Sequence, residues 1–292
     1  MGLCDIADIR EILGRHGFHF SKSLGQNFLT AAWVPEAIAE VCGVDADSCA
    51  LEVGPGMGCL TEQLSKRAKS VCAIELDRAL FPVLAETLAD CDNVEIVQGD
   101  VLKTDLKQLC AEKFGAQARI HACANLPYYI TTPAISALLQ SGVFDSVTVM
   151  IQKEVAQRIC AAPGTSDYSA FSIFVRYYAD AEIAVNVPRG CFVPQPKVDS
   201  AVVHMKLRGA PPVEILNEKL FFAMVRSAFN QRRKTLVNSL GGALGSTLGK
   251  TGIQALVEDC GFDPRIRGER LSLEDFAALA NLAHQRISLS EQ

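Results

Sequence analysis

The first two thirds of the chain alternate short apolar runs with segments in which apolar residues recur at helical spacing. Apolar runs of about four to eight residues, bounded by glycine or polar residues, are typical of strands buried on both faces of a sheet. The pattern predicts strands at residues 49–53, 70–75, 94–97, 120–124 and 146–151, then an antiparallel pair at 181–187 and 200–207. Strands that alternate with helices indicate a mostly parallel sheet with helices on both faces.

Helical spacing is the only pattern in the last third of the chain. Helices are expected at residues 216–230, 232–240, 253–260 and 273–287, after a linker at Gly209-Ala-Pro-Pro212. Ser272 and Asp275 form a capping box for the last of them. In the first part, helices are expected at residues 6–16, 35–42 and 60–67, with Asp77 as a cap and Thr132-Pro133 opening another. The sequence therefore predicts an α/β domain with a seven-stranded sheet at residues 1–208 and a small all-α domain at residues 213–292.

Charge is divided unevenly between these two parts. The net charge of the whole chain is −5, which by itself argues against a nucleic-acid partner. Residues 1–204 carry 16 Lys and Arg against 24 Asp and Glu, whereas residues 205–292 carry 12 against 9. Any contact with phosphate should therefore depend on the C-terminal part and on local basic clusters.

The 11 cysteines include no pair at the two-residue spacing of zinc or redox motifs. Several lie in apolar runs, which indicates free thiols in a reducing cytoplasm. No apolar run reaches the roughly 18–20 residues of a membrane span, and the N-terminus is too acidic for a targeting peptide. We therefore expect a cytoplasmic monomer with no membrane contact and no metal ion.

A glycine loop follows the first expected strand. Glu52-Val-Gly-Pro-Gly-Met-Gly58 contains Gly54, Gly56 and Gly58 between a strand and a helix, where glycine permits a tight turn and close approach of a ligand. The loop alone does not distinguish a cofactor site from a dinucleotide-binding loop or from a tight turn without a ligand.

Two acids at later strand ends favour a nucleoside ligand. Glu75 closes the second strand, where a carboxylate can accept both hydroxyls of a ribose, and Asp100 closes the third, where it can accept from an adenine amine. Either acid alone is equally consistent with a helix cap or a solvated charge. The Gly-x-Gly-x-Gly spacing favours S-adenosylmethionine over NAD, because S-adenosylmethionine has no pyrophosphate to place at a helix N-terminus.

Asn125-Leu-Pro-Tyr128 ends the fourth expected strand. The exocyclic nitrogen of adenine is a poor nucleophile because its lone pair is delocalised into the ring. The Asn125 side-chain oxygen and the Leu126 carbonyl can accept its two protons and so direct the lone pair at a methyl donor. Pro127 stiffens the loop, and Tyr128 and Phe192 offer rings for a base to stack on. An ordinary strand-ending turn and a core phenylalanine are the alternatives.

Seven segments occur together in the order of one family. They are Gln26-Asn-Phe-Leu29, the glycine loop, Glu75, Gly99-Asp100, Asn125-Leu-Pro-Tyr128, Gln152-Lys-Glu-Val-Ala156 and Phe192-x-Pro-x-Pro-Lys-Val-x-Ser200. Over nearly its whole length the chain resembles the ribosomal RNA adenine N6-dimethyltransferases. Phe229-Asn-Gln-Arg-Arg-Lys-Thr-Leu236 in the helical tail is similar to their bacterial small-subunit branch.

This resemblance implies a Rossmann-like class I methyltransferase domain that binds S-adenosylmethionine, and a C-terminal domain that binds RNA or the ribosome. It implies dimethylation of N6 on two adjacent adenines, in a hairpin loop near the 3′ end of 16S rRNA, during assembly of the small ribosomal subunit. It also implies cofactor contacts at Asn27, Leu29, Gly54, Gly56, Glu75, Asp100 and Asn125. Asn27 and Leu29 would form a lid over the cofactor.

An acidic chain needs a local basic patch to bind ribosomal RNA. The best candidates are the run at 232–234 and three further residues, although a basic run on a helix is otherwise usually a solvated face. The six candidates are Lys22, Lys153, Arg158, Arg232, Arg233 and Lys234.

Three other functions share parts of the pattern. Antibiotic-resistance methyltransferases of large-subunit rRNA share the catalytic motifs but are typically shorter and more basic. DNA adenine methyltransferases usually carry a larger recognition domain. A small-subunit assembly factor, in which binding matters more than methylation, would show the same motifs.

Overall fold

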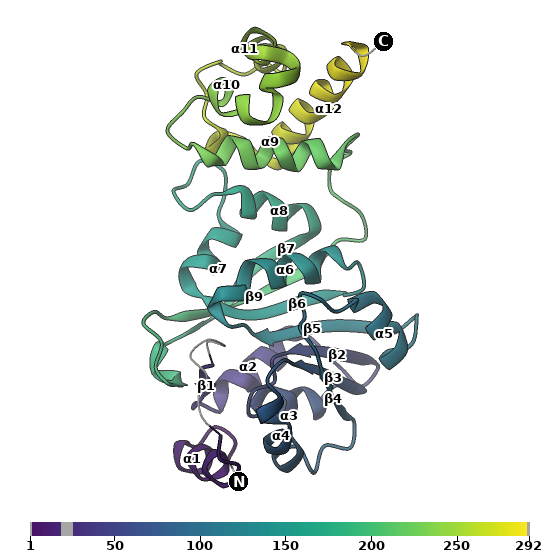
Figure 1. Ribbon diagram of the computed structural model, residues 1–292, viewed down its shortest axis with the longest axis vertical. Helices are drawn as coiled ribbons and strands as arrows, with labels where there is room; N and C mark the ends of the chain where they lie inside the picture. The colour runs from purple at the N-terminus through teal and green to yellow at the C-terminus, as the bar shows by residue number, and fades with distance from the viewer. Residues whose placement is uncertain (1, 19–25, 291–292) are drawn as a thin grey trace. The chain divides into compact units, whose positions relative to one another are not determined.

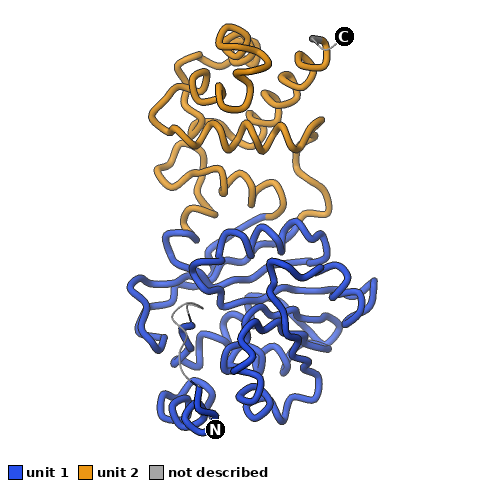
Figure 2. The backbone as a smooth tube through the Cα atoms, viewed as in Figure 1, with its two compact units in different colours: residues 1–156, 180–207 blue, residues 157–179, 208–292 orange. Residues whose placement is uncertain are grey.

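The computed structural model describes residues 2–18 and 26–290. The chain forms two compact units (Figure 2): residues 1–156 with 180–207, called here the sheet unit, and residues 157–179 with 208–292, called here the helical unit. The C-terminal boundary falls next to the one expected from the sequence. Residues 157–179, which the sequence placed in the first domain, cluster with the helical unit.

The sheet unit is built on a seven-stranded sheet with the order β4-β3-β2-β5-β6-β9-β7 (Figure 1). Its strands are β2 (Ser48–Val53), β3 (Ser70–Glu75), β4 (Val94–Gln98), β5 (Arg119–Asn125), β6 (Ser146–Gln152), β7 (Ala179–Val187) and β9 (Ser200–Leu207). Strands β2 to β6 pair in parallel, and β9 runs antiparallel to β6. The mostly parallel seven-stranded sheet expected from the sequence is confirmed.

Helices and one small second sheet complete the sheet unit. The helices are α1 (Ile6–Arg15), α2 (Trp33–Cys42), α3 (Cys59–Ser65), α4 (Phe81–Thr87), α5 (Leu106–Phe114), α6 (Thr131–Gln140) and α7 (Lys153–Cys160), the last continuing into the helical unit. Short 3-10 helices occur at η2 (Arg78–Leu80), η3 (Tyr128–Ile130) and η4 (Arg189–Cys191). Strands β1 (Phe28–Leu29) and β8 (Phe192–Val193) form the two-stranded sheet.

Local capping explains where several of these elements begin. The Asp77 carboxylate accepts a hydrogen bond from the N–H of Ala79, which confirms the expected cap. Helix α6 begins at Thr131, one residue before the expected Thr132-Pro133 start. Strand β2 is buried at all six positions because it lies between β3 and β5 in the sheet.

The helical unit consists of α8 (Ala170–Tyr178), α9 (Glu218–Asn230), α10 (Leu236–Ser239), α11 (Gly241–Asp259), η5 (Gly268–Arg270) and α12 (Leu273–Ser290). Residues 157–179 belong to it because α8 carries an aromatic face. The ring of Tyr177 packs 5.4 Å from Phe222 and 5.9 Å from Phe221 of α9, between centroids. This burial of aromatic surface binds the segment to the helical core.

Two expectations for the helical unit have clear outcomes. Ser272 N–H donates to the Asp275 carboxylate at 2.8 Å and Asp275 N–H donates to Ser272 Oγ at 3.2 Å, so the capping box is confirmed. Helix α11 starts at Gly241, twelve residues before the expected start at 253, with a kink at Gly249. Its first half is glycine-rich, and glycine disfavours a helix by about 1 kcal/mol relative to alanine. The sequence pattern therefore did not predict this half of the helix.

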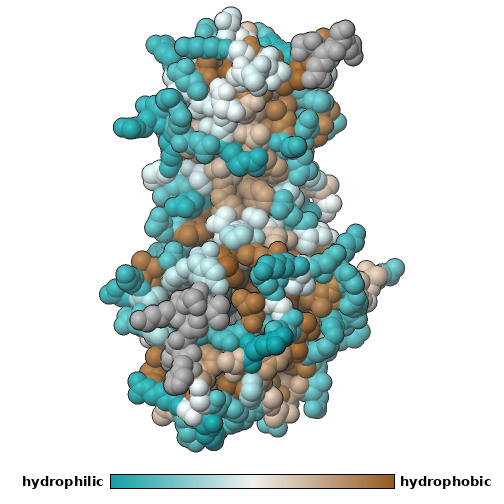
Figure 3. All heavy atoms as spheres, viewed as in Figure 1, coloured by the Kyte–Doolittle hydropathy of each residue, from teal (hydrophilic) through white to brown (hydrophobic). Residues whose placement is uncertain are grey.

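Hydrophilic residues cover much of the visible surface of both units, with hydrophobic residues in scattered patches (Figure 3). Among the described residues, no helix combines the length and apolar character needed to cross a membrane.

Candidate active site

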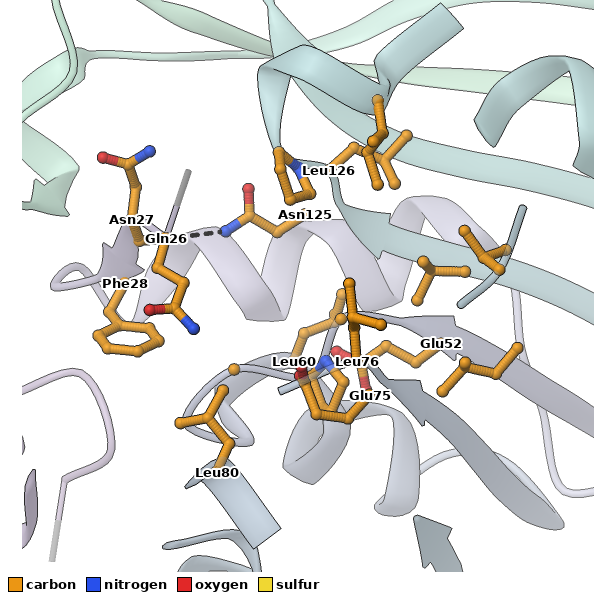
Figure 4. Close-up of a pocket in the computed structure, with 18 of the residues that line it drawn as sticks. Gln26, Asn27, Phe28, Glu52, Leu60, Glu75, Leu76, Leu80, Asn125 and Leu126 are labelled. Atoms are coloured by element: carbon orange, nitrogen blue, oxygen red, sulfur yellow. Dashed lines mark hydrogen bonds between the residues drawn. The ribbon is translucent and has the colours of Figure 1, made fainter. Parts of the chain in front are cut away.

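The carboxyl ends of β2, β3, β4 and β5 lie at one edge of the sheet (Figure 1). The register pairs Val53 with both Ile74 and Ala124, and Glu75 with Gln98, so the four strands end nearly level. Open α/β sheets bind ligands at this edge. A pocket opens there, lined by the loops after these strands and by the segment before α2 (Figure 4).

The pocket brings together all eleven residues to which the sequence assigned cofactor binding or catalysis. They are Asn27, Leu29, Gly54, Gly56, Glu75, Asp100, Asn125, Leu126, Pro127, Tyr128 and Phe192. Residues as far apart in sequence as Asn27 and Phe192 thus share one cavity, while the chemical role of each stays a prediction.

Two glycines of the loop after β2 are needed for different reasons. Gly54 has a φ of +70°, and a Cβ placed on it would meet nothing within 4 Å, so its backbone faces open space in the pocket. Gly58 has a φ of +88°, and its Cβ would lie 2.9 Å from the Leu88 side chain. Gly58 therefore allows Leu88 to pack against the loop, whereas the space beside Gly54 can hold a ligand that lies against the backbone.

Glu75 closes β3 with its carboxylate held by backbone groups. Its Oε1 accepts a 2.7 Å hydrogen bond from the N–H of Asp77. Burial, the largest effect, raises the pKa of Glu75 above its usual value, while the N–H groups of Asp77, Gly56 and Leu76 oppose that rise. The carboxylate is therefore fixed as an acceptor inside the pocket (Figure 4).

Glu52 is a second buried carboxyl in the same pocket, and it was not predicted as a site residue. Burial raises its pKa to about 8, and the negative charge of Glu75 adds to that rise while the Thr61 hydroxyl opposes it. Among the described residues, neither Glu52 Oε2 nor Thr61 Oγ1 makes a hydrogen bond of normal geometry. A buried carboxyl oxygen that lacks a donor favours a ligand that brings one, or that brings positive charge.

Asp100 follows β4 at the pocket wall. Its Oδ1 accepts from the N–H of Leu102 at 3.0 Å, and Lys103 Nζ lies 3.6 Å from Oδ2. The Lys103 side chain is 83% exposed, so this ion pair contributes little. The carboxylate therefore has acceptor capacity for a ligand.

Asn125 ends β5 and contacts the segment that precedes α2. Its Nδ2 donates to the Asn27 carbonyl at 3.4 Å (Figure 4), which orients Oδ1 as the acceptor of the amide. Leu126 is buried, and its N–H donates to the Met150 carbonyl at 3.1 Å. The loop after β5 is thus fixed to β6 on one side and to residue 27 on the other.

Two aromatic rings flank this loop. The Tyr128 hydroxyl lies 3.0 Å from Ser200 Oγ, and burial raises its pKa. Phe192 lies directly opposite Leu29 in the β1–β8 pair, and the Thr30 N–H donates to the Cys191 carbonyl at 2.8 Å. The small sheet therefore joins the expected lid to the expected stacking ring.

Five of the six basic residues expected to bind RNA lie in described segments, on α7 and in the turn after α9. Lys153 is exposed at the start of α7, Arg158 is half-buried further along it, and Lys22 lies outside the described residues. Residues 232–234 lie in the turn between α9 and α10, so the expectation of a helix over 232–240 is wrong. Helix α10 begins only at Leu236 because Thr235 has an extended backbone.

Arg232 differs from the two cations that follow it. Its Nη2 donates to the Ser166 carbonyl at 2.8 Å, and its Nε lies 3.5 Å from the Glu269 carboxylate. It therefore joins three segments of the helical unit. Arg233 and Lys234 are exposed and, among the described residues, carry no hydrogen bond or ion pair from their side chains.

Tyr129, like Glu52, lines the pocket without having been predicted. The signal for Glu52 was an acid inside an apolar run directly before the glycine loop. Tyr129 gave no signal, because nothing in the sequence shows that its side chain is 57% exposed at the pocket. No group of three or more metal-ligating side chains lies together in the described ranges 2–18 and 26–290.

Comparison with known proteins gives consistent matches over nearly the whole chain. The family model described as ribosomal RNA adenine dimethylase matches residues 17–285. Proteins named ribosomal RNA small subunit methyltransferase A, from Geobacillus thermodenitrificans and Geobacillus kaustophilus, are each 48% identical over 274 residues. Those matches cover 93% of this chain and 94% of each relative.

Two solved structures share the fold. A dimethyladenosine transferase from Plasmodium falciparum is 26% identical with a TM-score of 0.75, covering 89% of this chain and 98% of that one. The 23S rRNA methyltransferase ErmE is 25% identical with a TM-score of 0.67, covering 88% and 100%. The expected Rossmann-like fold class is therefore confirmed.

Proposed function

The chain belongs to the ribosomal RNA adenine dimethylase family, and from that premise we propose that it methylates N6 of two adjacent adenines near the 3′ end of 16S rRNA. The methyl donor is S-adenosylmethionine, and the product is N6,N6-dimethyladenosine in the small ribosomal subunit. The small-subunit branch is supported by the names of relatives 48% identical to this chain. The observation that carries the chemistry is one pocket holding the glycine loop, Glu75 and the loop after β5.

The residues present in the pocket fit S-adenosylmethionine. The open space beside Gly54 admits a ligand against the backbone, Glu75 is placed to accept ribose hydroxyls, and Asp100 to accept from the adenine amine. The buried Glu52 carboxyl, whose Oε2 makes no hydrogen bond of normal geometry within the described residues, suits a cationic ligand, because a nearby positive charge stabilises its ionised form. When bound, the cofactor supplies an electrophilic methyl group on a sulfonium.

The loop after β5 acts on the target adenine. Asn125 Oδ1 and the Leu126 carbonyl accept the two amine protons, which removes the lone pair from conjugation and directs it at the methyl donor. Tyr128 and Phe192 hold the base between their rings after it has left its loop. No residue needs to act as a strong base before transfer, because the positively charged product amine loses its proton readily.

The RNA partner requires affinity beyond the pocket. Arg233 and Lys234 are free to contact phosphates, whereas the contacts of Arg232 assign it mainly to holding the helical unit together. Lys153 and Arg158 contribute from α7.

Labelled cofactor tests the proposal. Small subunits from a strain lacking this modification are incubated with the protein and methyl-labelled S-adenosylmethionine, and the labelled nucleoside is then identified. Dimethyladenosine in small-subunit RNA is expected. Label in naked large-subunit RNA instead would assign the chain to the resistance-type enzymes.

The Asn125→Ala variant tests the assembly-factor alternative separately. If this variant loses methylation but restores subunit maturation as fully as the unaltered protein, binding is the main function. If maturation fails as well, the chemistry is the main function.

A further inference from the structure

Three exposed cations gather around Asp199 at the carboxyl edge of the sheet. The Lys153 N–H donates to the Asp199 carbonyl at 3.0 Å, and the Arg189 N–H donates to Asp199 Oδ1 at 2.9 Å. Arg189 Nη1 in turn donates to the Lys197 carbonyl at 3.3 Å. These hydrogen bonds hold three separate segments together, and each segment carries one exposed cation. The three cations, Lys153, Arg189 and Lys197, are called here the patch.

The patch is locally basic on an acidic unit. The sheet unit as a whole carries 15 Lys and Arg against 23 Asp and Glu. Two carboxylates lie in the patch: Glu154, next to Lys153, and Asp199, whose Oδ1 is engaged by a backbone N–H. Within the described part of the chain, the amines of Lys153 and Lys197 have no hydrogen bond or ion pair. These two amines therefore have no structural partner among the residues that the structure describes, and both are available to bind phosphate groups.

Direct contacts connect the patch to the pocket. Gln152, which precedes Lys153, is paired across the sheet with Ser200, which follows Asp199. Ser200 Oγ lies 3.0 Å from the Tyr128 hydroxyl. Tyr129 follows Tyr128, lines the same pocket and is 57% exposed, which is unusual for a large aromatic side chain.

We propose that Tyr129, Lys153, Arg189 and Lys197, called here the target rim, bind the single-stranded RNA that flanks the target adenine. Tyr129 stacks on the neighbouring base, and the three cations hold the adjoining phosphates. An exposed aromatic ring and exposed cations on connected segments are the combination with which proteins bind single strands. Because the proposed substrate has two adjacent adenines, one remains outside when the other enters the pocket. The inference therefore rests on the proposed function.

The cations are tested with the double variant Lys153→Gln/Lys197→Gln, which leaves the Arg189 contacts in place. The probe is a synthetic RNA hairpin whose loop carries two adjacent adenines, and its dissociation constant is measured over a range of salt. The slope of log affinity against log salt should become shallower by about 0.7 for each phosphate that the variant no longer neutralises. The affinity for S-adenosylmethionine should not change.

The matched control is Lys69→Gln/Lys206→Gln. Both lysines are exposed cations of the same unit, but they lie at the opposite edge of the sheet: Lys69 precedes β3, and Lys206 pairs with Ser146, the first residue of β6. This control removes the same charge and should leave the salt slope unchanged. Equal slopes for both double variants would overturn the role of the cations.

Tyr129 is tested by Tyr129→Ala and Tyr129→Phe on the same hairpin, with 2-aminopurine at the adenine next to the target. Tyr129→Ala should weaken hairpin binding about tenfold, the order of one base–aromatic stack, and should relieve quenching of the 2-aminopurine. Tyr129→Phe keeps the ring and should behave like the unaltered protein. If Tyr129→Phe is as defective as Tyr129→Ala, the hydroxyl is responsible and stacking is refuted.

Failure of the inference is distinguishable from failure of the proposed function. If the unaltered protein produces no dimethyladenosine in small subunits, the proposed function fails. If it does so while the rim variants bind the hairpin like the unaltered protein, only the target rim is wrong.

Discussion

The two units of this molecule differ in the sign of their net charge and in whether they line the pocket. The sheet unit carries 15 Lys and Arg against 23 Asp and Glu, and two of its carboxyls, Glu52 and Glu75, are buried in the pocket. The helical unit carries 13 Lys and Arg against 10 Asp and Glu, and none of its residues that the structure describes lines that pocket. Buried carboxyls that can ionise beside a positive charge suit a cationic cofactor, whereas the acidic balance of this unit opposes a polyanionic substrate.

This difference shows why an acidic chain can act on RNA. Affinity for phosphate does not follow net charge but depends on where unpaired cations lie. In the proposed account, the sheet unit supplies the chemistry and a small basic rim, and the helical unit supplies Arg233 and Lys234. Five variants, in four experiments, test this division, from the largest expected effect to the smallest.

Asn125→Ala should have the largest effect, and it should be confined to the chemistry. Removing a preorganised acceptor for the amine is expected to lower kcat by about 10²- to 10³-fold, the order seen when one transition-state hydrogen bond is removed. Single-turnover methylation of small subunits measures this rate. Binding of the subunits, measured in parallel, should persist; a decrease in binding as large as the decrease in rate would break the division between the units.

Phe192→Leu should have the next largest effect. Leucine retains apolar packing opposite Leu29 in the β1–β8 pair but removes the ring on which the base is proposed to stack. A decrease in kcat/KM of about 10- to 100-fold is expected, the order of one stacking interaction. Calorimetric titration should show that affinity for S-adenosylmethionine changes far less. Equal losses in both measurements would remove Phe192 from the target site.

Two variants of the turn between α9 and α10 should separate RNA binding from stability. They are the double variant Arg233→Gln/Lys234→Gln and the single variant Arg232→Gln. The double variant should weaken subunit binding about tenfold and make its salt dependence shallower, with no change in Tm. Arg232→Gln should instead lower Tm by about 2–4 °C, because the shorter neutral side chain cannot hold Ser166 and Glu269 as arginine does. The reverse assignment would show that Arg232 is the residue that contacts RNA.

Glu52→Gln should have the smallest effect, visible in stability against pH. The pKa of Glu52 in the folded protein is raised to about 8 from 4.5, so the folded carboxyl holds its proton more tightly than the unfolded one. The free energy of unfolding therefore loses this contribution as pH rises from about 4.5 to about 8. Glu52→Gln removes that loss. The free energy of unfolding of the variant, measured with urea, should therefore rise relative to that of the unaltered protein over this pH interval. A constant difference at pH 5, 7 and 9 would contradict the buried neutral carboxyl.

Much of the sheet unit could be predicted because parallel strands leave a strong local pattern. Buried strands appear as apolar runs, and each of the first four strands ends in a recognisable segment, such as Glu75 or Asn125. The sequence alone therefore predicts most of the cofactor and catalytic candidates at one edge of the sheet. Asn27 and Leu29 came from the resemblance alone, because their approach to the pocket depends on long-range pairing with Phe192 and its neighbour.

The features that could not be predicted depend on contacts distant in sequence. Residues 157–179 join the helical unit through aromatic packing against α9, which no local pattern reveals. The burial of Glu52 and the exposure of Tyr129 are tertiary properties of single positions. Arg232 resembles Arg233 in sequence, and only the positions of Ser166 and Glu269 separate their roles.

The most direct test of the central claim is the methylation state of 16S rRNA in a strain that lacks this modification and carries this chain. The 3′ fragment of the RNA is isolated and analysed by mass spectrometry, with Asn125→Ala as the matched control. The account predicts two methyl groups on each of two adjacent adenines with the unaltered chain, and a strongly reduced level of methylation with Asn125→Ala. Unmodified adenines with both proteins, or methylation that is undiminished in Asn125→Ala, would contradict it.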